Sequence, residues 1–458
     1  MCFQKVSAQS LSNDITLLVD FSSTVSYSNN ECGGILVSSD PTVYPPCSSF
    51  KDAGNRARQY LNSGLVIPNS NSLTIKAINT EFLQSISGES AQLGNLFGFC
   101  SIQILVKTTT SPVIADGTLS TSNFISLEEP NVPNTSYTCS SPKLLLIKFI
   151  NFINWGDQTI LYTNVKQNGG VITKQNIYLV AIITSNSNSI INVLPKDANF
   201  EYGSLEFFIS SCSFRNLFSL SALPPFNFIG SKVNIASTGF LDSTINSSPF
   251  IYLKVGHINI KVSSVIDHVV INNGFPFVKT LNLGDNFYYN NVNITNCIFS
   301  KFLQHENNKV DNLPKEVDIS QIFGMNINNN IITSNSNDPL NSFFSFQNFP
   351  GVSYTLNILF VSVRDNQVSG DKSLISNENS NTFIANFEIP NTFPIGINTQ
   401  NSNNNVFSSN IDSNIPFAGN NSIFSYNGLP AYTVANINNF DCDVCQISVE
   451  GVVVYDHY

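Results

Sequence analysis

The sequence predicts an all-β protein: a right-handed parallel β-helix, or β-solenoid, with a short N-terminal capping helix. Charged residues make up only 11% of the 458 residues, so the surface must be polar through neutral side chains. Asparagine and serine supply that polarity, and both are poor helix-interior residues. Short apolar segments also recur at intervals of roughly 20–35 residues without long helical patterns between them, which is typical of a β-solenoid.

The net charge limits the classes of partner. The formal charge is −10 at pH 7, the pI is about 4.8, and no basic run offsets the scattered acidic residues. Such a surface has no electrostatic footprint for phosphate backbones or anionic lipids, so we expect no nucleic-acid binding. No stretch reaches ~18 consecutive apolar residues, so we expect no membrane-spanning helix.

Residues 1–47 are expected to form an irregular or short-stranded lead-in, because Asn29-Asn30, Gly33-Gly34 and Pro45-Pro46 interrupt regular structure. One short amphipathic helix is predicted over 48–61, with Ser48 or Ser49 as its N-cap. Apolar residues recur in it at helical spacing, at Phe50, Ala53, Ala57, Tyr60 and Leu61.

An isoleucine-led pattern repeats downstream of the helix. Each copy starts with isoleucine and places a second apolar residue at its fifth or sixth position. The copies begin at Ile209, Ile235, Ile260, Ile294 and Ile327, and Ile358 and Ile384 continue the series. The steps are 26, 25, 34, 33, 31 and 26 residues. A coil of this size cannot bury its apolar face alone, so stacking on its neighbours must supply the core.

The unequal steps predict loops that project from one corner of the coil, at Asp285–Asn291 and Gln304–Val317. Asn-rich turns suit such corners, because Asn tolerates left-handed backbone geometry and stacked Asn side chains form hydrogen-bonded ladders. The predicted organisation is therefore a β-helix over 48–440, followed by a C-terminal strand or cap segment over 441–458.

The helix at Ser48–Leu61, the segments Leu65-Val-Ile-Pro and Leu73-Thr-Ile-Lys-Ala-Ile, and rungs such as Ile294-Thr-Asn-Cys-Ile-Phe resemble the pectin-lyase-like right-handed β-helix superfamily. The Cys-Gly-Gly and Pro-Cys-Ser-Ser-Phe lead-in also resembles that of Asn-rich β-helix proteins from amoebal surfaces. The resemblance covers roughly residues 45–440 and implies a helix that caps the N-terminal end of the solenoid. A β-sandwich or jelly-roll array is the alternative fold, and it explains the recurring Ile-x-x-x-x-Phe spacing less well.

Enzymes of this superfamily act on acidic polysaccharides, so the resemblance raises the question whether their catalytic motifs occur in this sequence. None of the Asn-Thr-Asp, Asp-Asp, Gly-His-Gly or Arg-Ile-Lys motifs of the polygalacturonase-like members is intact here. Acid–base cleavage of a glycoside needs two carboxylates across the bond. Asp242 and Asp267 fall in neighbouring expected coils and, with His268, are the catalytic candidates; the competing interpretation is turn-capping aspartates and a surface histidine. If the protein is an enzyme, one groove should contain two or more of five residues: Asp242, His257, Lys261, Asp267 and His268.

Two cysteine pairs are disulfide candidates. Cys32 and Cys47 flank a turn-rich segment, and Cys442 and Cys445 form a lone Cys-x-x-Cys. For Cys442 and Cys445, a local disulfide or two structural thiols is favoured. A zinc site would need a second pair of ligands, and a thioredoxin-type redox site would need a βαβ unit; the sequence shows neither.

Cys212 and Cys297 are expected at equivalent places in two strands, where a buried cysteine acts as a small apolar residue. No phosphate-binding glycine loop and no nucleophile elbow occurs in the sequence. The sequence therefore predicts no cofactor and no metal site.

Four sequons are glycosylation candidates if the protein enters a secretory pathway: Asn134, Asn246, Asn293 and Asn420. Two aromatic runs, 287–289 and 343–346, fall in expected loops. These runs either fold back over a solenoid face as core or form an adhesive or oligomer-contact patch.

By elimination, the sequence predicts a non-enzymatic structural or adhesive β-helix that is extracellular, on a cell surface or on a virion. Its expected partners are further copies of itself, in a homo-oligomer or assembly, together with carbohydrate or surface proteins. The alternative is a polysaccharide lyase or glycoside hydrolase with a degenerate site. Met1–Ser10 lack the apolar core of a signal peptide, so export is expected by another route unless a presequence is missing from this numbering.

Overall fold

The computed structural model describes residues 14–24, 32–36, 45–62, 71–78, 84–106, 113–129, 139, 143–156, 158–164, 174–196, 204–219, 222–282, 287–306, 318–334, 342–347, 354–359, 361–370, 372–378, 381–385, 395–400, 405–408, 421–427, 433–435, 445–449 and 452–457. The chain divides into two compact units, Met1–Phe207 and Phe208–Tyr458, and the division falls inside β15 (Leu205–Ser210). Each unit is described by itself.

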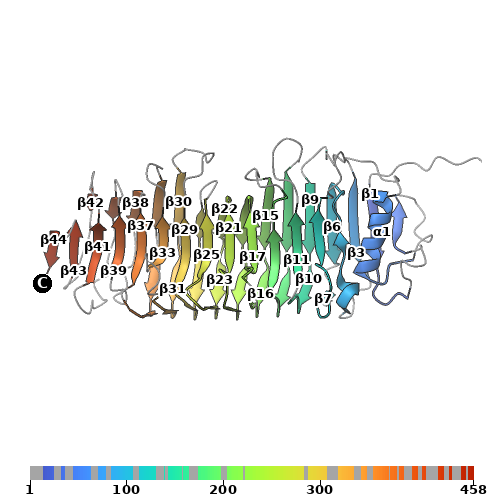
Figure 1. Cartoon of the computed structure of the whole chain (residues 1–458), viewed down its shortest axis with the longest axis horizontal. Coiled ribbons are helices and arrows are strands. Elements are labelled where there is room, and N and C mark those ends of the chain that lie inside the picture. The colour runs from blue at the N-terminus through green and yellow to red at the C-terminus, as the bar shows by residue number, and fades with distance from the viewer. Residues whose placement is uncertain are drawn as a thin grey trace, which may run out of the picture. The chain divides into compact units, whose positions relative to one another are not determined.

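Unit 1 contains α1 (Phe50–Asn62), the short 3-10 helix η2 (Gly88–Ala91) and three stacks of strands (Figure 1). Its sheet 1 holds β2 (Gly34–Leu36), β1 (Asp14–Val19), β3 (Ser72–Ala77), β6 (Ser101–Val106), β9 (Lys143–Lys148) and β12 (Gln175–Val180). Its sheet 2 holds β4 (Gln84–Ser87), β7 (Val113–Asp116), β10 (Ile150–Ile153) and β13 (Ile183–Ser185). Its sheet 3 holds β5 (Gly94–Asn95), β8 (Ile125–Glu128), β11 (Thr159–Asn164) and β14 (Ser189–Val193).

Unit 2 repeats this order of strands along the chain and adds a fourth, narrow sheet. Its sheet 1 holds β18 (Ser231–Ala236), β22 (His257–Lys261), β26 (Tyr288–Asn290), β30 (Asp318–Phe323), β34 (Tyr354–Leu359), β38 (Asn381–Ala385), β40 (Asn405–Ser408) and β42 (Thr433–Ala435). Its sheet 2 holds β16 (Ser213–Arg215), β19 (Gly239–Leu241), β23 (Ser264–Asp267), β27 (Val292–Thr295), β31 (Asn326–Asn328) and β35 (Ser362–Arg364).

Sheet 3 of unit 2 holds β17 (Phe226–Ile229), β21 (Ile251–Lys254), β25 (Pro276–Leu281), β29 (Lys301–Glu306), β33 (Ser342–Gln347), β37 (Ser373–Glu378), β39 (Ile395–Gln400), β41 (Asn421–Asn427), β43 (Cys445–Val449) and β44 (Val452–His457). Its sheet 4 holds β20 (Thr244–Ile245), β24 (Val270–Ile271), β28 (Ile298–Phe299), β32 (Ile331–Ile332) and β36 (Gln367–Val368).

The pairing of strands from coil to coil confirms the predicted fold class. Within each unit, strands of successive coils pair in parallel, as β18 does with β22 and β23 with β27. Among the described strands the antiparallel exceptions are β2, which pairs with β1, and β44, which pairs with β43. The protein is therefore an all-β parallel β-helix with a short N-terminal helix.

Parallel pairing extends past both predicted boundaries of the β-helix. β1 lies inside the predicted lead-in 1–47 and pairs in parallel with β3. β43 lies inside the predicted terminal segment 441–458 and pairs in parallel with β41. From β37 to β43 the described strands alternate between sheets 3 and 1, because among the described strands sheets 2 and 4 end at β35 and β36.

Helix α1 has the predicted N-cap. The Ser49 hydroxyl accepts a hydrogen bond from the Asp52 backbone N–H at 3.0 Å and donates to the Asp52 carboxylate at 2.7 Å. This exchange satisfies one of the N–H groups that a helix start leaves without a partner. The predicted apolar face is buried except for Leu61, which is half-buried, and Phe50 packs edge-on against Phe124 at 5.5 Å.

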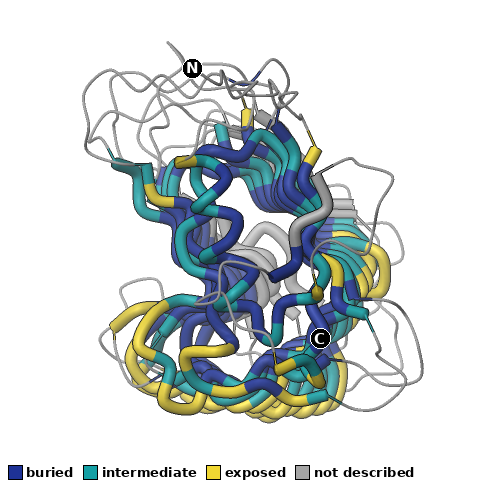
Figure 2. The backbone as a smooth tube through the Cα atoms, turned by 90° about the vertical axis from the view of Figure 1, so that its right-hand side faces the viewer, coloured by how far each residue is buried: buried dark blue, intermediate teal, exposed yellow. Residues whose placement is uncertain are grey.

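The core of unit 2 contains stacked phenylalanines. In sheet 3 the rings of consecutive coils lie nearly parallel, with interplanar angles of 9–22° and centroid distances of 4.8–6.2 Å, at Phe250, Phe277, Phe302 and Phe343. Side chains alternate between buried and half-exposed along strands such as β18, which is the period-2 pattern of a sheet with one buried face. Figure 2 shows buried residues on the inner sides of the coils and exposed residues gathered at the turns.

The isoleucine-led pattern spans corners between sheets rather than single strands. Ile235 lies in β18 and Phe240 in β19, so their six-residue segment turns from sheet 1 into sheet 2. Ile260 pairs with Tyr289, whereas Ile294 pairs with Ile266 in sheet 2. The predicted alignment of Ile260 with Ile294 was therefore wrong, because Ile260 lies in sheet 1 and Ile294 lies in sheet 2. The two positions look alike in the sequence because the corner after each sheet has an apolar residue on either side of left-handed backbone.

The core interpretation of the two aromatic runs is confirmed for all their aromatic residues except Tyr288, which is half-exposed, and the runs lie at strands rather than in the expected loops. Phe343, Phe344 and Phe346 lie on β33 and are at most 1% exposed. Phe287 and Tyr289 are fully buried at β26. Among the described residues, the exposed large hydrophobic side chains are aliphatic, at Leu119, Ile183, Leu223, Val262 and Ile331.

Candidate functional site

The three catalytic candidates lie together at the corner that follows sheet 2 of unit 2. Asp267 ends β23, and His268 follows it in left-handed backbone geometry with φ of 52°. Asp242 has the same geometry one coil earlier, and its backbone N–H donates to the Asp267 carbonyl at 3.1 Å. Asp242 thus stacks beside His268 rather than beside Asp267, and both side chains are exposed at the turn.

The Asp267 carboxylate is held by three neighbours. One oxygen accepts hydrogen bonds from the Thr295 hydroxyl and the Asn296 amide, both at 2.8 Å. The other lies 2.9 Å from Nδ1 of His268. Partial burial raises the pKa of Asp267, but the bonds from Asn296, Thr295 and His268 outweigh burial and leave the pKa lowered. A general acid needs the opposite shift, so this geometry favours a carboxylate that ties two coils together.

The other residues of the enzymatic hypothesis lie elsewhere. His257 and Lys261 are the first and last residues of β22, which belongs to sheet 1, whereas Asp267 belongs to sheet 2. The structure therefore brings Asp267 and His268 into contact but separates them from His257 and Lys261 by a corner. None of these residues lines the groove described below.

A buried asparagine column runs just inside the same corner. The side-chain oxygen of Asn330 accepts from the Cys297 backbone N–H at 2.9 Å, and that of Asn366 accepts from the Asn330 backbone N–H at 2.9 Å. The Asn366 amide also donates to the Ile327 carbonyl at 2.9 Å. These bonds satisfy backbone groups that the turn takes out of the sheet ladders, so the column is structural.

Two disulfides join described cysteines of unit 1. Cys32 and Cys47 are bonded, as the sequence suggested for this pair, and Cys100 is bonded to Cys139. The second bond was missed because its partners are 39 residues apart, about one coil with its loop, and nothing local indicates the pairing. The predicted Cys442–Cys445 pair lies outside the described residues, except for the backbone of Cys445.

Cys212 and Cys297 are buried thiols outside the disulfides, and they lie at two different corners, not at equivalent places. Cys212 precedes β16 and Cys297 precedes β28, and each follows a residue in left-handed geometry. Burial raises the pKa of Cys297 to about 12, which keeps it protonated and unreactive.

Within the described ranges, no three His, Cys, Asp or Glu side chains are grouped so that they could hold a metal ion. Nor does any helix in these ranges have the length and apolar content needed to cross a lipid bilayer.

Two of the four sequons lie in described segments. Asn246 is exposed at the turn after β20, where its side-chain oxygen accepts from the Asn272 amide at 2.7 Å. Asn293 is half-exposed in the middle of β27 and accepts from the Asn326 amide at 2.9 Å. Asn246 is the more accessible acceptor. Asn134 and Asn420 lie outside the described residues.

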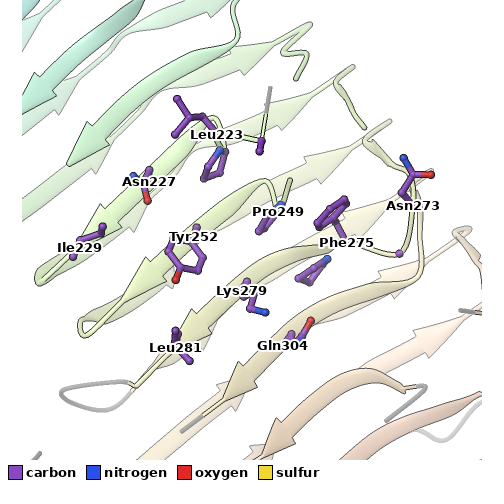
Figure 3. Close-up of a pocket in the computed structure, with 14 residues that line it drawn as sticks. Leu223, Asn227, Ile229, Pro249, Tyr252, Asn273, Phe275, Lys279, Leu281 and Gln304 are labelled. Carbon is purple, nitrogen blue, oxygen red and sulfur yellow. The ribbon is translucent and has the colours of Figure 1, made fainter. Parts of the chain in front are cut away.

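A groove of about 600 Å³ lies on the outer face of sheet 3 in unit 2. Its floor is a row of outward-facing residues on four adjacent strands, because Asn227, Tyr252, Lys279 and Gln304 are register partners in turn. Figure 3 shows Tyr252 in the middle of this row, between Asn227 and Lys279. Apolar residues of the turns that precede the strands form one wall, at Leu223, Pro249 and Phe275.

The charges at the edge of the groove neutralise each other. Nζ of Lys279 lies 3.3 Å from Oε1 of Glu306, and the Gln304 amide donates to the same oxygen. Partial burial and the nearby Glu306 charge both raise the pKa of Tyr252, so its phenol stays a hydrogen-bond donor at neutral pH. The groove therefore offers two aromatic side chains, Tyr252 and Phe275, together with neutral polar groups and no net charge from its ion pair.

Sequence reasoning missed these groove residues. Their signal is weak: Tyr252, Lys279 and Gln304 recur at steps of 27 and 25 residues, and each is a half-exposed residue between two buried ones. Only Tyr252 has apolar residues on both sides, because Thr280 follows Lys279 and His305 follows Gln304. Such alternation shows which side chains point outward but not that the outer face is hollowed. The walls that make the hollow come from turns that vary in length between coils.

Comparisons with known proteins add little to this description. No protein-family model and no curated protein matches the chain. Among solved structures, the chain is similar to tailspike protein 3 of bacteriophage CBA120, with 12% identity and a TM-score of 0.36, over 86% of this chain and 59% of that chain. The chain thus spans less than two thirds of that tailspike. The strand pairing identifies the fold as a parallel β-helix.

Proposed function

We propose that the protein is a non-enzymatic structural or adhesive β-helix, displayed outside a cell or on a virion. The observation that carries this proposal is the pair of disulfides, Cys32–Cys47 and Cys100–Cys139. Disulfides persist in oxidising compartments and are rare in the cytosol. Both staple the N-terminal unit, where a protein exposed to harsh surroundings gains from covalent support.

The polar chemistry of the outer turns supports the same role. In unit 2, exposed Asn residues of successive coils bond to each other, as Asn329 does to Asn296 at 2.6 Å and Asn272 to Asn246 at 2.7 Å. These ladders use neutral groups, which tolerate wide changes of pH and salt better than surface ion pairs. The carboxylate of Asp267 is engaged in the same kind of ladder rather than facing a groove.

The test is size-exclusion chromatography with light scattering on native material, combined with a glycan stain and a peptide map without reductant. We expect a homo-oligomeric assembly that carries glycan on Asn246 and contains both disulfides. A bare monomer with Cys32, Cys47, Cys100 and Cys139 all reduced would contradict the proposal. In that case the next assay would be depolymerisation of acidic polysaccharides, which the lyase or hydrolase alternative predicts.

A further inference from the structure

We infer that the groove on the outer face of sheet 3 binds a neutral glycan, with a sugar ring stacked on Tyr252. This inference rests on the proposed surface role and names the ligand class of one site within it. It starts from the shape of the groove. A volume of about 600 Å³ is in the range of small-ligand sites.

The lining matches the two sides of a sugar ring. A pyranose presents apolar C–H groups on its faces and hydroxyl groups around its edge. Tyr252 offers a half-buried ring at the centre of the floor, with Pro249 and Phe275 beside it toward the turns (Figure 3). Asn227 and Gln304 lie on either side of Tyr252 along the row, and amides can both donate to and accept from hydroxyl groups.

The ion pair decides between neutral and acidic glycans. Lys279 is the cation of the groove floor, and it already has Glu306 at 3.3 Å. A uronic acid placed against Lys279 would bring its carboxylate close to the Glu306 carboxylate, and like charges at such distances repel. A second lysine, Lys254, follows Tyr252 by two residues on β21, but it does not line the groove. A neutral sugar meets no such penalty.

The groove has room for more than one sugar ring along its own row, from Asn227 to Gln304. The row ends at Gln304 as a binding surface, because its next register partners, Ser345 on β33 and Ser376 on β37, are only 2% and 1% exposed. Neighbouring strands lie about 4.8 Å apart, so the row runs across the strands as a track of regular spacing. An oligosaccharide is therefore favoured over a monosaccharide.

The probes are cellohexaose, xylohexaose, mannohexaose and laminarihexaose as neutral ligands, with hexagalacturonate as the acidic one. Binding is measured by calorimetry on the full chain in an Asn246→Gln background. That background excludes a glycan of the protein itself at the rim, because the Asn273 amide, which lines the groove, donates to the Asn246 carbonyl at 2.7 Å. We expect at least one neutral hexasaccharide to bind and hexagalacturonate to bind at least tenfold more weakly.

Variants test the site itself. Tyr252→Ala is expected to weaken binding of the neutral ligand at least tenfold, whereas Tyr252→Phe, which keeps the ring, weakens it less than threefold. The matched control is Tyr162→Ala, a half-buried tyrosine on β11, on the outer face of sheet 3 of unit 1, with no part in the groove. Glu306→Gln removes the partner of Lys279 and is expected to increase binding of hexagalacturonate.

Each contrary result has a defined meaning. Equal loss in Tyr252→Ala and Tyr162→Ala, or preference of the wild type for hexagalacturonate, overturns the assignment of the groove. Binding of none of the five hexasaccharides at millimolar concentration overturns the glycan ligand. The assembly state and disulfides of the same preparation are measured in parallel, so a failed groove is distinguished from a failed surface role. Circular dichroism of each variant checks that it is folded.

Discussion

Single residues with left-handed backbone geometry make the corners of the coils. In unit 2 the corner after sheet 2 places such a residue in every described coil, with φ between 48° and 54°, at Asn216, Asp242, His268, Asn296, Asn329 and Asp365. Asn and Asp adopt this geometry at lower cost than other residues with a Cβ, because their short side chains bond locally. Asp242 and His268, which looked reactive in the sequence, are thereby explained as corner residues.

A buried lysine predicts an unusual dependence of stability on pH. Lys143 in unit 1 is 4% exposed, and its amine lies 4.1 Å from the centre of the Phe97 ring. Burial lowers the pKa of Lys143 to about 8, although the charge of Glu129 opposes the shift. Between about pH 8 and 10.5 the unfolded chain therefore binds more protons than the folded one, so stability rises with pH across that window.

Lys143→Met is expected to be more stable than the wild type at pH 7 by about 3 kcal/mol, because the shift is about 2.5 pKa units and each unit corresponds to about 1.4 kcal/mol. The difference should shrink as pH rises through the window from about 8 to 10.5, and it is lost above that window, where the wild-type amine is neutral in both states. The measurement is urea unfolding of the full chain at pH 7, 8.5 and 10, followed by the fluorescence of Trp155.

The control for this variant is Lys148→Met, at the other end of β9. Lys148 is half-exposed and lies over the Phe149 ring at 4.6 Å, so the substitution also removes a cation–ring contact. If Lys148→Met shows the same gain and the same pH dependence, burial of Lys143 is not the cause.

At the scale of elements, the buried asparagine column holds consecutive coils in register. Asn366→Val is expected to cost about 2–4 kcal/mol, because it leaves the Asn330 N–H groups and the Ile327 carbonyl buried without their partner. The comparison is Asn326→Val, since Asn326 is exposed on β31 and its loss should cost about 0.5 kcal/mol or less. Thermal unfolding by far-UV circular dichroism measures both, and equal losses would show that burial of the column is not important.

Helix α1 depends on one close approach. A Cβ added to Gly54 would lie 2.0 Å from the Leu93 backbone oxygen, so the helix could not keep its position. Gly54→Ala should therefore destabilise unit 1 by about 1–3 kcal/mol, although alanine favours a free helix by about 1 kcal/mol.

The readout for Gly54→Ala is urea unfolding followed by Trp155 fluorescence. Asn62→Ala, at the exposed end of the same helix, is the control and is expected to have little effect. A stabilised Gly54→Ala variant would mean that helix propensity outweighs the contact with Leu93.

At the scale of the whole molecule, stability is local because a coil contacts mainly its neighbours. The strands that end sheet 1 of unit 1 and sheet 3 of unit 2, β2 and β44, run antiparallel to their partners. These two pairs therefore depart from the parallel pairing that joins successive coils. Both disulfides and Trp155 belong to unit 1, whereas Cys212 and Cys297 of unit 2 are reduced.

This distribution predicts that reduction weakens unit 1 selectively. The disulfides join residues 15 and 39 apart in sequence, and the chain-entropy model assigns loops of these sizes about 3 and about 4 kcal/mol. With dithiothreitol, the urea midpoint reported by Trp155 should fall clearly. Hydrogen exchange of peptides from β23 to β28 in unit 2 should be unchanged, and equal deprotection of both units would refute local stability.

Much of the fold could be predicted because its causes are local in sequence. The Ser49 cap of α1, the inward-facing isoleucines of β18 and β22, and the Asn residues of the corners each follow from the chemistry of a few neighbouring residues. The alignment failed at Ile294 because two successive corners carry the same apolar–polar–apolar pattern. The site was predicted less well: Asp267 and His268 lie in contact, but a corner separates them from His257 and Lys261, and the groove around Tyr252 was not anticipated.

The sequence by itself determined the β-solenoid class, the capping helix and the residues suited to its turns, since these depend on backbone preference and short-range periodicity. Only the tertiary structure decided which sheet each strand joins, that Cys100 meets Cys139, and that Tyr252, Lys279 and Gln304 form one row. The physical reason is that these contacts join different coils. Their partners depend on the length of every intervening turn, and no pattern within a single coil contains that information.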